Sequence, residues 1–339
     1  MMDKIKPMIA DKNMLKMKSL KIMRIQLYTL SLLFFLPHFI ATSYAEKLTF
    51  TPSETMVYKK VGDIELKVDI FNPEEHKASD KAPAIVFFFS GGWAQGHRSQ
   101  YHALCEYFSK RGMVAMTAGY RIMKRDGTTP AECLKDAKSV IRWIRRNATT
   151  LGIDPEKLAA GGGSAGGHLA AALGSCEGFN EEGEDTTVSC VPNALVLHNP
   201  VYYNGEDGFG YRKVKDYWEA FSPYHNIKET TPPTIVFFGS ADKHLKNGIP
   251  QEYQKKMQAL GIPSELIIYD GLGHGFYNFT RIEDGFKNTT LEADRFLAEL
   301  GFLDGKPRED LLPVCTDAYR EEADRLERER RALYPENSK

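Results

Sequence analysis

The residues best suited to chemistry are a serine and the glycines around it. Gly162-Gly163-Ser164-Ala165-Gly166 follows a short apolar segment at 158–160 and precedes a run of small residues at 167–172. A strand-to-helix turn that exposes a serine hydroxyl needs glycine two positions before and two after it, because a Cβ there would clash with neighbouring backbone. The spacing therefore predicts a nucleophilic Ser164. The alternative is a phosphate-binding turn, but no lysine follows at the P-loop position.

A serine hydroxyl is a weak nucleophile, so it needs a base, and the base needs a carboxylate that fixes its tautomer. Asp242 follows the apolar run at 234–238, and His274 follows the run at 266–269. In a parallel sheet both would lie at the edge formed by the carboxyl ends of the strands, where sites of such sheets are found. Asp270 is the rival acid, but it would have to fold back along the loop of His274. The interpretation is a Ser164, Asp242 and His274 triad.

The other histidines have simpler interpretations. His168 lies one helical turn after Ser164 and is expected to be packed or hydrogen-bonded, while His198 and His244 are alternative bases. No cysteine or histidine cluster has zinc-site spacing, so we expect no structural metal. The serine mechanism also requires no cofactor.

The reaction would develop negative charge on a carbonyl oxygen, which needs backbone N–H donors already aimed at it. Ser90-Gly91-Gly92-Trp93 follows the apolar run ending at Phe89 and can form such a turn. The residue after the nucleophile supplies another donor. We expect Gly92, Trp93 and Ala165 to donate to this oxyanion.

The elements that must position these residues alternate along the chain. One segment alternates apolar and polar side chains, as a half-buried strand does, whereas six continuous apolar runs indicate strands buried on both faces. The alternating segment is 64–70, and the runs are 84–89, 114–118, 158–160, 194–197, 234–238 and 266–269. Helical spacing falls at 131–147, 166–173, 251–260 and 291–300. This order predicts one α/β domain with a mostly parallel sheet and helices on both faces.

The two ends of the sequence differ from this domain. Basic residues precede an apolar stretch at 27–40 that ends in Ser43-Tyr44-Ala45, the order of a secretory signal peptide. We therefore expect residues 1–45 to be a cleaved signal, 46–303 to be the catalytic domain, and 304–339 to be a charged C-terminal helix or tail. The mature protein is then expected to be periplasmic or secreted, without stable membrane association.

Composition and cysteines narrow the function further. The chain has 339 residues, 42% of them hydrophobic, with 44 basic and 45 acidic residues, which excludes disorder. Because basic and acidic residues are nearly equal in number, the chain also lacks the excess of positive charge that is typical of a nucleic-acid-binding protein. In an exported protein Cys176 and Cys190 could form a disulfide across an acidic loop, or all five cysteines could be free thiols. Oligomeric state is not predicted.

The chain resembles the α/β-hydrolase superfamily, specifically the hormone-sensitive-lipase-like esterases and exported acetylxylan and feruloyl esterases. The motifs that carry the resemblance are the oxyanion segment 90–93, Gly119-Tyr120-Arg121, the segment 151–155, the serine turn, and Gly273-His274-Gly275-Phe276. Ser90 stands where the family usually has His, and Lys243-His244 stands where a Val-Pro pair is common. The resemblance implies an α/β-hydrolase fold and hydrolysis of short acyl esters, acetyl ahead of feruloyl, on polysaccharide.

Fewer features of the sequence indicate the substrate. Little sequence precedes the core strands, so we expect a minimal cap and an open site. Aromatic residues are dense between Val201 and Tyr224, and we expect Tyr203 and Trp218 to bind an acylated carbohydrate by stacking on its sugars. Two alternatives are a serine peptidase of the same fold, which would be expected to carry a propeller or large cap, and a non-catalytic binding protein.

Overall fold

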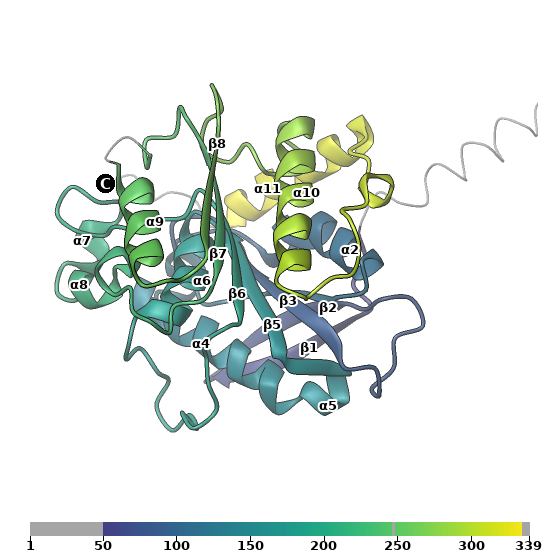
Figure 1. The fold of residues 1–339 in the computed structure, drawn as a ribbon. Coiled ribbons are helices and arrows are strands. Elements are labelled where there is room, and N and C mark those ends of the chain that lie inside the picture. The colour runs from purple at the N-terminus through teal and green to yellow at the C-terminus, as the bar shows by residue number, and fades with distance from the viewer. Residues whose placement is uncertain (1–49, 246–247, 334–339) are drawn as a thin grey trace, which may run out of the picture. The chain divides into compact units, whose positions relative to one another are not determined.

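The computed structural model describes residues 50–245 and 248–333. Its centre is an eight-stranded sheet with the strand order β1-β2-β4-β3-β5-β6-β7-β8 (Figure 1). The strands are β1 (Glu54–Val61), β2 (Ile64–Phe71), β3 (Ala82–Phe88), β4 (Val114–Ala118), β5 (Ile153–Gly163), β6 (Ala194–His198), β7 (Thr234–Gly239) and β8 (Ser264–Tyr269). The first two strands pair antiparallel to each other, β2 pairs antiparallel to β4, and the remaining pairs are parallel.

The helices form a layer on each face of this sheet (Figure 1). Side chains of α4, α6 and α9 belong to one hydrophobic core, and those of α2 and α10 belong to the other. The α-helices are α2 (His102–Lys110), α3 (Met123–Asp126), α4 (Pro130–Arg146), α5 (Ala148–Leu151), α6 (Ala165–Ser175), α7 (Tyr211–Val214), α8 (Trp218–Phe221), α9 (Ile249–Ala259), α10 (Glu283–Glu299) and α11 (Asp317–Leu333). The 3-10 helices of the described residues are η2 (Arg98–Tyr101), η3 (Pro223–His225) and η4 (Glu309–Leu311).

Strand β3 explains why the sequence runs are continuously apolar. Val86 and Phe88 belong to one core, while Ile85 and Phe87, with the opposite side-chain direction, belong to the other. A central strand must be apolar at every position because both of its faces are covered. The predicted α/β architecture is therefore confirmed.

Strand β1 and helix α2 are the longest of the elements that were not predicted. Strand β1 lies at the edge of the sheet, and Tyr58 is its one buried residue, so its sequence lacks a clear apolar pattern. Helix α2 buries most of its residues, including Leu104, Tyr107 and Phe108, and its polar face is only the narrow row of His102, Glu106 and Lys110. Helix α10 also begins eight residues earlier than expected, because Gly285 interrupts the helical signal there.

The C-terminal helix α11 packs through an aromatic contact. The ring of Tyr319 lies 5.4 Å from Phe50 and 5.2 Å from Phe279, and the guanidinium of Arg330 donates a hydrogen bond to Ser99.

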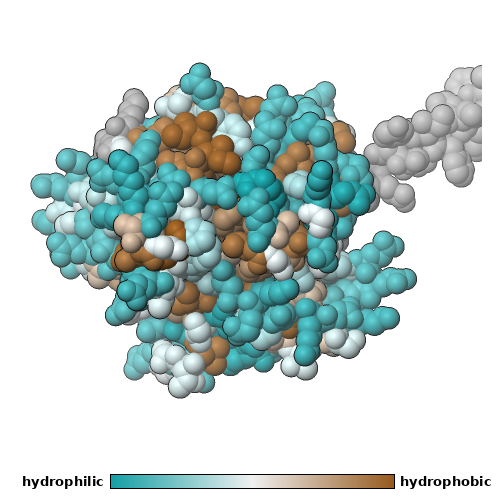
Figure 2. Space-filling view, viewed as in Figure 1, coloured by the Kyte–Doolittle hydropathy of each residue, from teal (hydrophilic) through white to brown (hydrophobic). Residues whose placement is uncertain are grey.

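In the view of Figure 2, hydrophilic residues cover most of the surface and hydrophobic residues gather in small groups between them. Among the helices of the described residues, none is both long and apolar enough to cross a membrane.

Two predictions concern the ends and the thiols. The expected signal peptide at 1–45 lies outside the described residues. All five cysteines fall within them, and each is a free thiol, so the structure contains no bond between Cys176 and Cys190.

Candidate active site

Ser164 lies at a sharp turn between β5 and α6. Its backbone has φ 52° and ψ −117°, a conformation that costs energy in a residue with a side chain and that is typical of functional sites. A Cβ at Gly162 would lie 2.6 Å from the carbonyl oxygen of Phe88, and one at Gly166 would lie 2.0 Å from the same oxygen. Both glycines are therefore required by the close approach of β3, as the sequence spacing predicted.

The structure brings Asp242 and His274 together at the carboxyl ends of β7 and β8. The Nδ1–H of His274 donates to Oδ2 of Asp242 over 2.7 Å. The side-chain amide of Asn199 donates to the same oxygen, and the backbone N–H of His244 donates to Oδ1 over 2.9 Å. Burial alone would raise the pKa of the Asp242 carboxyl, but these hydrogen bonds hold it below its ordinary value. The buried carboxylate is thus ionised and can orient the imidazole.

The rival acid lies elsewhere. Asp270 is exposed and accepts a hydrogen bond from the hydroxyl of Ser240 over 3.0 Å. No described residue hydrogen-bonds His274 apart from Asp242, and Ser164 is likewise not hydrogen-bonded to it. Hydrogen bonds between a nucleophile and its base are often long before substrate binds. The missing hydrogen bond is therefore compatible with His274 as the base of Ser164.

The oxyanion segment forms a tight turn after β3. Gly91, Gly92 and Trp93 all have positive φ, at 125°, 62° and 60°. Within the described residues, no group accepts a hydrogen bond from the N–H of Gly92 or Trp93. Ala165 begins α6, where the first N–H groups of a helix have no partner within the helix. The indole of Trp93 is buried, so only its backbone is available to a substrate.

Ser90 and three side chains to which the sequence analysis gave no role hold this turn in place. The hydroxyl of Ser90 donates to the carbonyl oxygen of Gly163 over 3.0 Å and lies 2.7 Å from the hydroxyl of Tyr277. Gln100 accepts from the Ser90 N–H over 2.7 Å, and its amide donates to Asn278 over 2.6 Å. The oxyanion turn, the serine turn and the histidine loop are therefore joined by one network.

Comparisons with known proteins point to one family. The BD-FAE family model matches residues 68–195, and the prolyl oligopeptidase family model matches residues 188–297. A solved structure of esterase 2 from Thermogutta terrifontis, phosphorylated by paraoxon, is 42% identical to this chain. The match covers 75% of this chain and 96% of that chain, with a TM-score of 0.70. The chain belongs to the α/β-hydrolase esterases.

Other relatives agree with this family. A propionate-bound structure of the Thermogutta terrifontis esterase is 40% identical over 78% of this chain and 99% of that chain, with a TM-score of 0.72. The probable isoprenylcysteine alpha-carbonyl methylesterase ICMEL1 of Arabidopsis thaliana is 22% identical over 61% of this chain and 48% of its own length. The chain thus spans about half the length of that curated relative. The α/β-hydrolase fold implied by the resemblance is confirmed, whereas the likeness to acetylxylan and feruloyl esterases stays a prediction.

The remaining histidines of this esterase differ in their surroundings. His168 is buried and donates through Nε2 to the carbonyl oxygen of Phe221 over 2.8 Å. His198 is also buried, and burial lowers the pKa of both imidazoles to about 3. His244 instead lies beside the predicted base, with ring centroids 5.1 Å apart. The expectation for His168 is confirmed, and His198 is too deeply buried to serve as the base.

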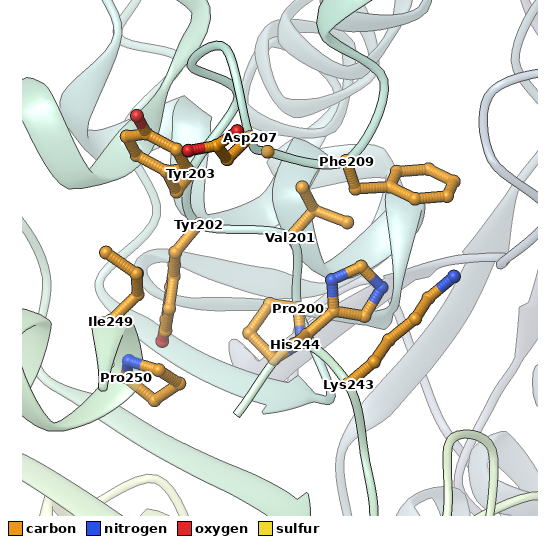
Figure 3. Close-up of a pocket in the computed structure, with 11 residues that line it drawn as sticks. Pro200, Val201, Tyr202, Tyr203, Asp207, Phe209, Lys243, His244, Ile249 and Pro250 are labelled. Carbon is orange, nitrogen blue, oxygen red and sulfur yellow. The ribbon is translucent and has the colours of Figure 1, made fainter. Parts of the chain in front are cut away.

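A cavity of about 290 Å³ has His244 in its lining (Figure 3). Tyr203 and Asp207 lie on one side of it, and Lys243 and His244 lie on another. Trp218 is not part of this wall; its ring is 6.3 Å from that of Tyr203 and packs against His225. Of the two predicted aromatic residues, the structure therefore brings only Tyr203 to the cavity.

Some of the missed residues had a signal in the sequence. Asn199 follows β6 directly, so its side chain begins at the same sheet edge as Asp242. Tyr277 and Asn278 belong to the loop that carries His274. Gln100 has no such signal, because Asn278, to which its amide donates, lies 178 residues later along the chain.

Proposed function

We propose that the protein is a serine carboxylesterase in which Ser164 is the nucleophile, His274 the general base and Asp242 the orienting acid. The observation that carries the proposal is the hydrogen bond from His274 to buried Asp242, at the sheet edge where Ser164 occupies its strained turn. An exposed imidazole held in one tautomer can accept the serine proton as the hydroxyl attacks.

Each proton transfer in the reaction passes through His274. Ser164 Oγ attacks the ester carbonyl while His274 takes its proton, and the tetrahedral intermediate collapses as His274 returns that proton to the leaving alcohol. Water then attacks the acyl-enzyme while His274 takes its proton, and His274 returns that proton to Ser164 Oγ as the acid is released. Asp242 remains ionised throughout and stabilises the imidazolium.

The oxyanion of each intermediate would be held by the N–H groups of Gly92, Trp93 and Ala165. The support is that the first two donate to no described residue and that the third begins a helix. Donors that need not move as charge develops stabilise the transition state more than water does.

The direct test is hydrolysis of p-nitrophenyl acetate by the wild type and by Ser164→Ala. We expect the variant to lose roughly a thousandfold or more in kcat. Because the related esterase has been captured phosphorylated by paraoxon, paraoxon should add one phosphoryl group to the wild type and none to Ser164→Ala, measured by intact mass. Equal rates in the two proteins would instead favour a non-catalytic binding protein.

The acyl group is proposed to be short, acetyl ahead of feruloyl. Structures of the Thermogutta terrifontis esterase with propionate and with butyrate support a small acyl site. A series of p-nitrophenyl esters from acetate to decanoate tests this point. A rate that rises steadily with chain length would argue against it.

The alcohol is proposed to be a polysaccharide. Tyr203 offers a ring at the cavity, and Asp207 and Lys243 offer charged groups that make no ion pair with any described residue. Sugars present hydroxyl groups to such side chains and flat faces to aromatic rings. We expect Tyr203→Ala to reduce turnover of acetylxylan more than turnover of p-nitrophenyl acetate. Trp218→Ala is the companion variant, and unchanged acetylxylan turnover in both would count against the carbohydrate.

A serine peptidase of the same fold is the second candidate. It is favoured by the prolyl oligopeptidase family match, which spans both Asp242 and His274. Assays with dipeptidyl p-nitroanilides separate the two activities. Export, which we also propose, is tested by fractionating cells that express the full chain with and without residues 1–45.

A further inference from the structure

Three potential metal ligands meet beside the predicted base. In the described part of the chain, one ligand atom each from Asp242, His244 and His274 lies within 4.8 Å of the other two. The sequence did not predict this cluster, because the histidines belong to different loops, after β7 and after β8. The cluster arises only when those parallel strands place their carboxyl ends side by side.

The spacing of the two imidazoles suits a shared metal ion. Their ring centroids are 5.1 Å apart and their planes are inclined by 56°. Two imidazoles that bind one tetrahedral Zn²⁺ at about 2.0–2.1 Å have centroids roughly 5 Å apart. The distance between the two rings is therefore compatible with a common ion.

Ring nitrogens are available on both residues. No described residue hydrogen-bonds either ring nitrogen of His244 or the second ring nitrogen of His274.

The pair formed by Asp242 and His274 also matches a metal-binding arrangement. Histidines that ligate metals commonly donate their other ring N–H to a carboxylate, which fixes the tautomer and makes the ring more basic. His274 already donates its Nδ1–H to Asp242. Binding through the second nitrogen would leave that hydrogen bond intact.

We infer that His244 and His274 form a binding site for a divalent transition-metal ion such as Zn²⁺, and that the bound ion inhibits the esterase by occupying the base. The inference rests on the proposed role of His274. Imidazole suits Zn²⁺, Cu²⁺ and Ni²⁺, whereas Mg²⁺ and Ca²⁺ prefer oxygen ligands and should not inhibit. The metal takes no part in ester hydrolysis and acts as a reversible block.

Nearby charges adjust the affinity in opposite directions. The Asp242 carboxylate attracts a cation, whereas Lys243 directly precedes His244 and carries a positive charge that repels one. The ammonium of Lys243 lies 5.6 Å from the centre of the Phe209 ring, along the wall that also carries His244 (Figure 3). Lys243→Ala should therefore bind Zn²⁺ more tightly than the wild type.

The experiment is a Zn²⁺ titration of the full protein by calorimetry, paired with inhibition of p-nitrophenyl acetate hydrolysis. His244→Phe keeps a ring against Phe209 but removes both nitrogens, and His225→Phe is the matched control at an exposed histidine. Each variant is compared with its own metal-free rate. We expect His244→Phe to weaken binding and inhibition by about tenfold or more, since even a supporting group around a metal site is worth that much.

Three outcomes separate this inference from the proposed function. Weaker binding and inhibition in His244→Phe alone, with chelator restoring wild-type activity, supports the metal site. Equal Zn²⁺ affinity in the wild type, His244→Phe and His225→Phe overturns it, while the Ser164→Ala result stands. Zn²⁺ that binds through His244 but leaves turnover unchanged also overturns the inhibitory site, and additionally counts against His274 as the base.

Discussion

The hydroxyl of Ser90 donates a hydrogen bond to the carbonyl oxygen of Gly163, 3.0 Å away. This contact joins the end of β3 to the end of β5, directly before the predicted oxyanion donors and the predicted nucleophile. In the family motif that the chain resembles, a histidine usually stands at the position of Ser90. Here the smaller residue performs the cross-link with its hydroxyl.

Ser90→Ala should lower kcat with little change in KM. The substitution removes the hydroxyl whose hydrogen bond aligns the oxyanion turn with Ser164. We expect kcat to decrease roughly tenfold to hundredfold, which is somewhat less than the effect of losing an oxyanion donor itself. Ser90→Thr retains the hydroxyl and should recover part of kcat. Steady-state kinetics with p-nitrophenyl acetate measure both, and a wild-type kcat in Ser90→Ala would refute the positioning role.

Replacing the acid should distinguish the two candidate carboxylates. Asp242→Asn removes the charge that holds His274 in its tautomer, and a loss of about 10⁴-fold in kcat is expected from the behaviour of serine triads. Asp270→Asn is the matched variant and should keep a kcat close to that of the wild type, because among the described residues its carboxylate bonds only Ser240. The reverse ranking would assign the acid to Asp270.

Buried histidines should make the protein less stable in mild acid. The folded pKa values of His168 and His198 are lowered to about 3 by burial, whereas unfolded histidine titrates near 6.5. The unfolded chain therefore binds more protons below about pH 6.5, so the free energy of unfolding falls as pH falls through that value. Each histidine contributes about 1.4 kcal/mol per pH unit.

The check is urea unfolding between pH 7.5 and 5, with His198→Leu beside the wild type. We expect a shallower pH dependence in the variant, because one titrating group has been removed from the difference between states. If the free energy of unfolding depends on pH equally in both proteins, the pKa of His198 is the same in the folded and unfolded states.

Glycine is required at one side of the serine turn for a steric reason. A Cβ at Gly166 would lie 2.0 Å from the Phe88 carbonyl oxygen, so Gly166→Ala should cost about 3 kcal/mol or more in the free energy of unfolding. Gly273→Ala is the control, since a Cβ there meets nothing within 4 Å. Thermal melts of both variants test the difference, and a similar Tm for the two would contradict the clash.

Much of the scaffold could be predicted because its strands and the serine turn are determined by patterns among neighbouring residues in the sequence. A strand covered on both faces must be apolar at every position, so β3, β4, β6 and β7 were visible as runs. The backbone of a serine turn requires glycines at fixed offsets, which made Ser164 visible. Edge strand β1 lacks such a pattern and was missed, and helix α2 was missed because its polar face is only a narrow row of residues.

Helix α10 shows how tertiary contact can override a local signal. Gly285 disfavours a helix by itself, but a Cβ there would lie 2.4 Å from the carbonyl oxygen of Phe276. The glycine allows the helix to approach the loop that follows His274. Its presence inside a helix is explained only by that approach.

The sequence by itself determined the alternation of strands and helices, the strained serine turn, and the order of serine, acid and histidine. Only the tertiary structure decided that Asp242, rather than Asp270, bonds His274, and that Gln100 links the oxyanion turn to the histidine loop. It also placed His244 beside His274. Backbone requirements act between neighbours and leave a pattern at fixed spacing, whereas hydrogen bonds between loops depend on which strand ends the sheet brings together.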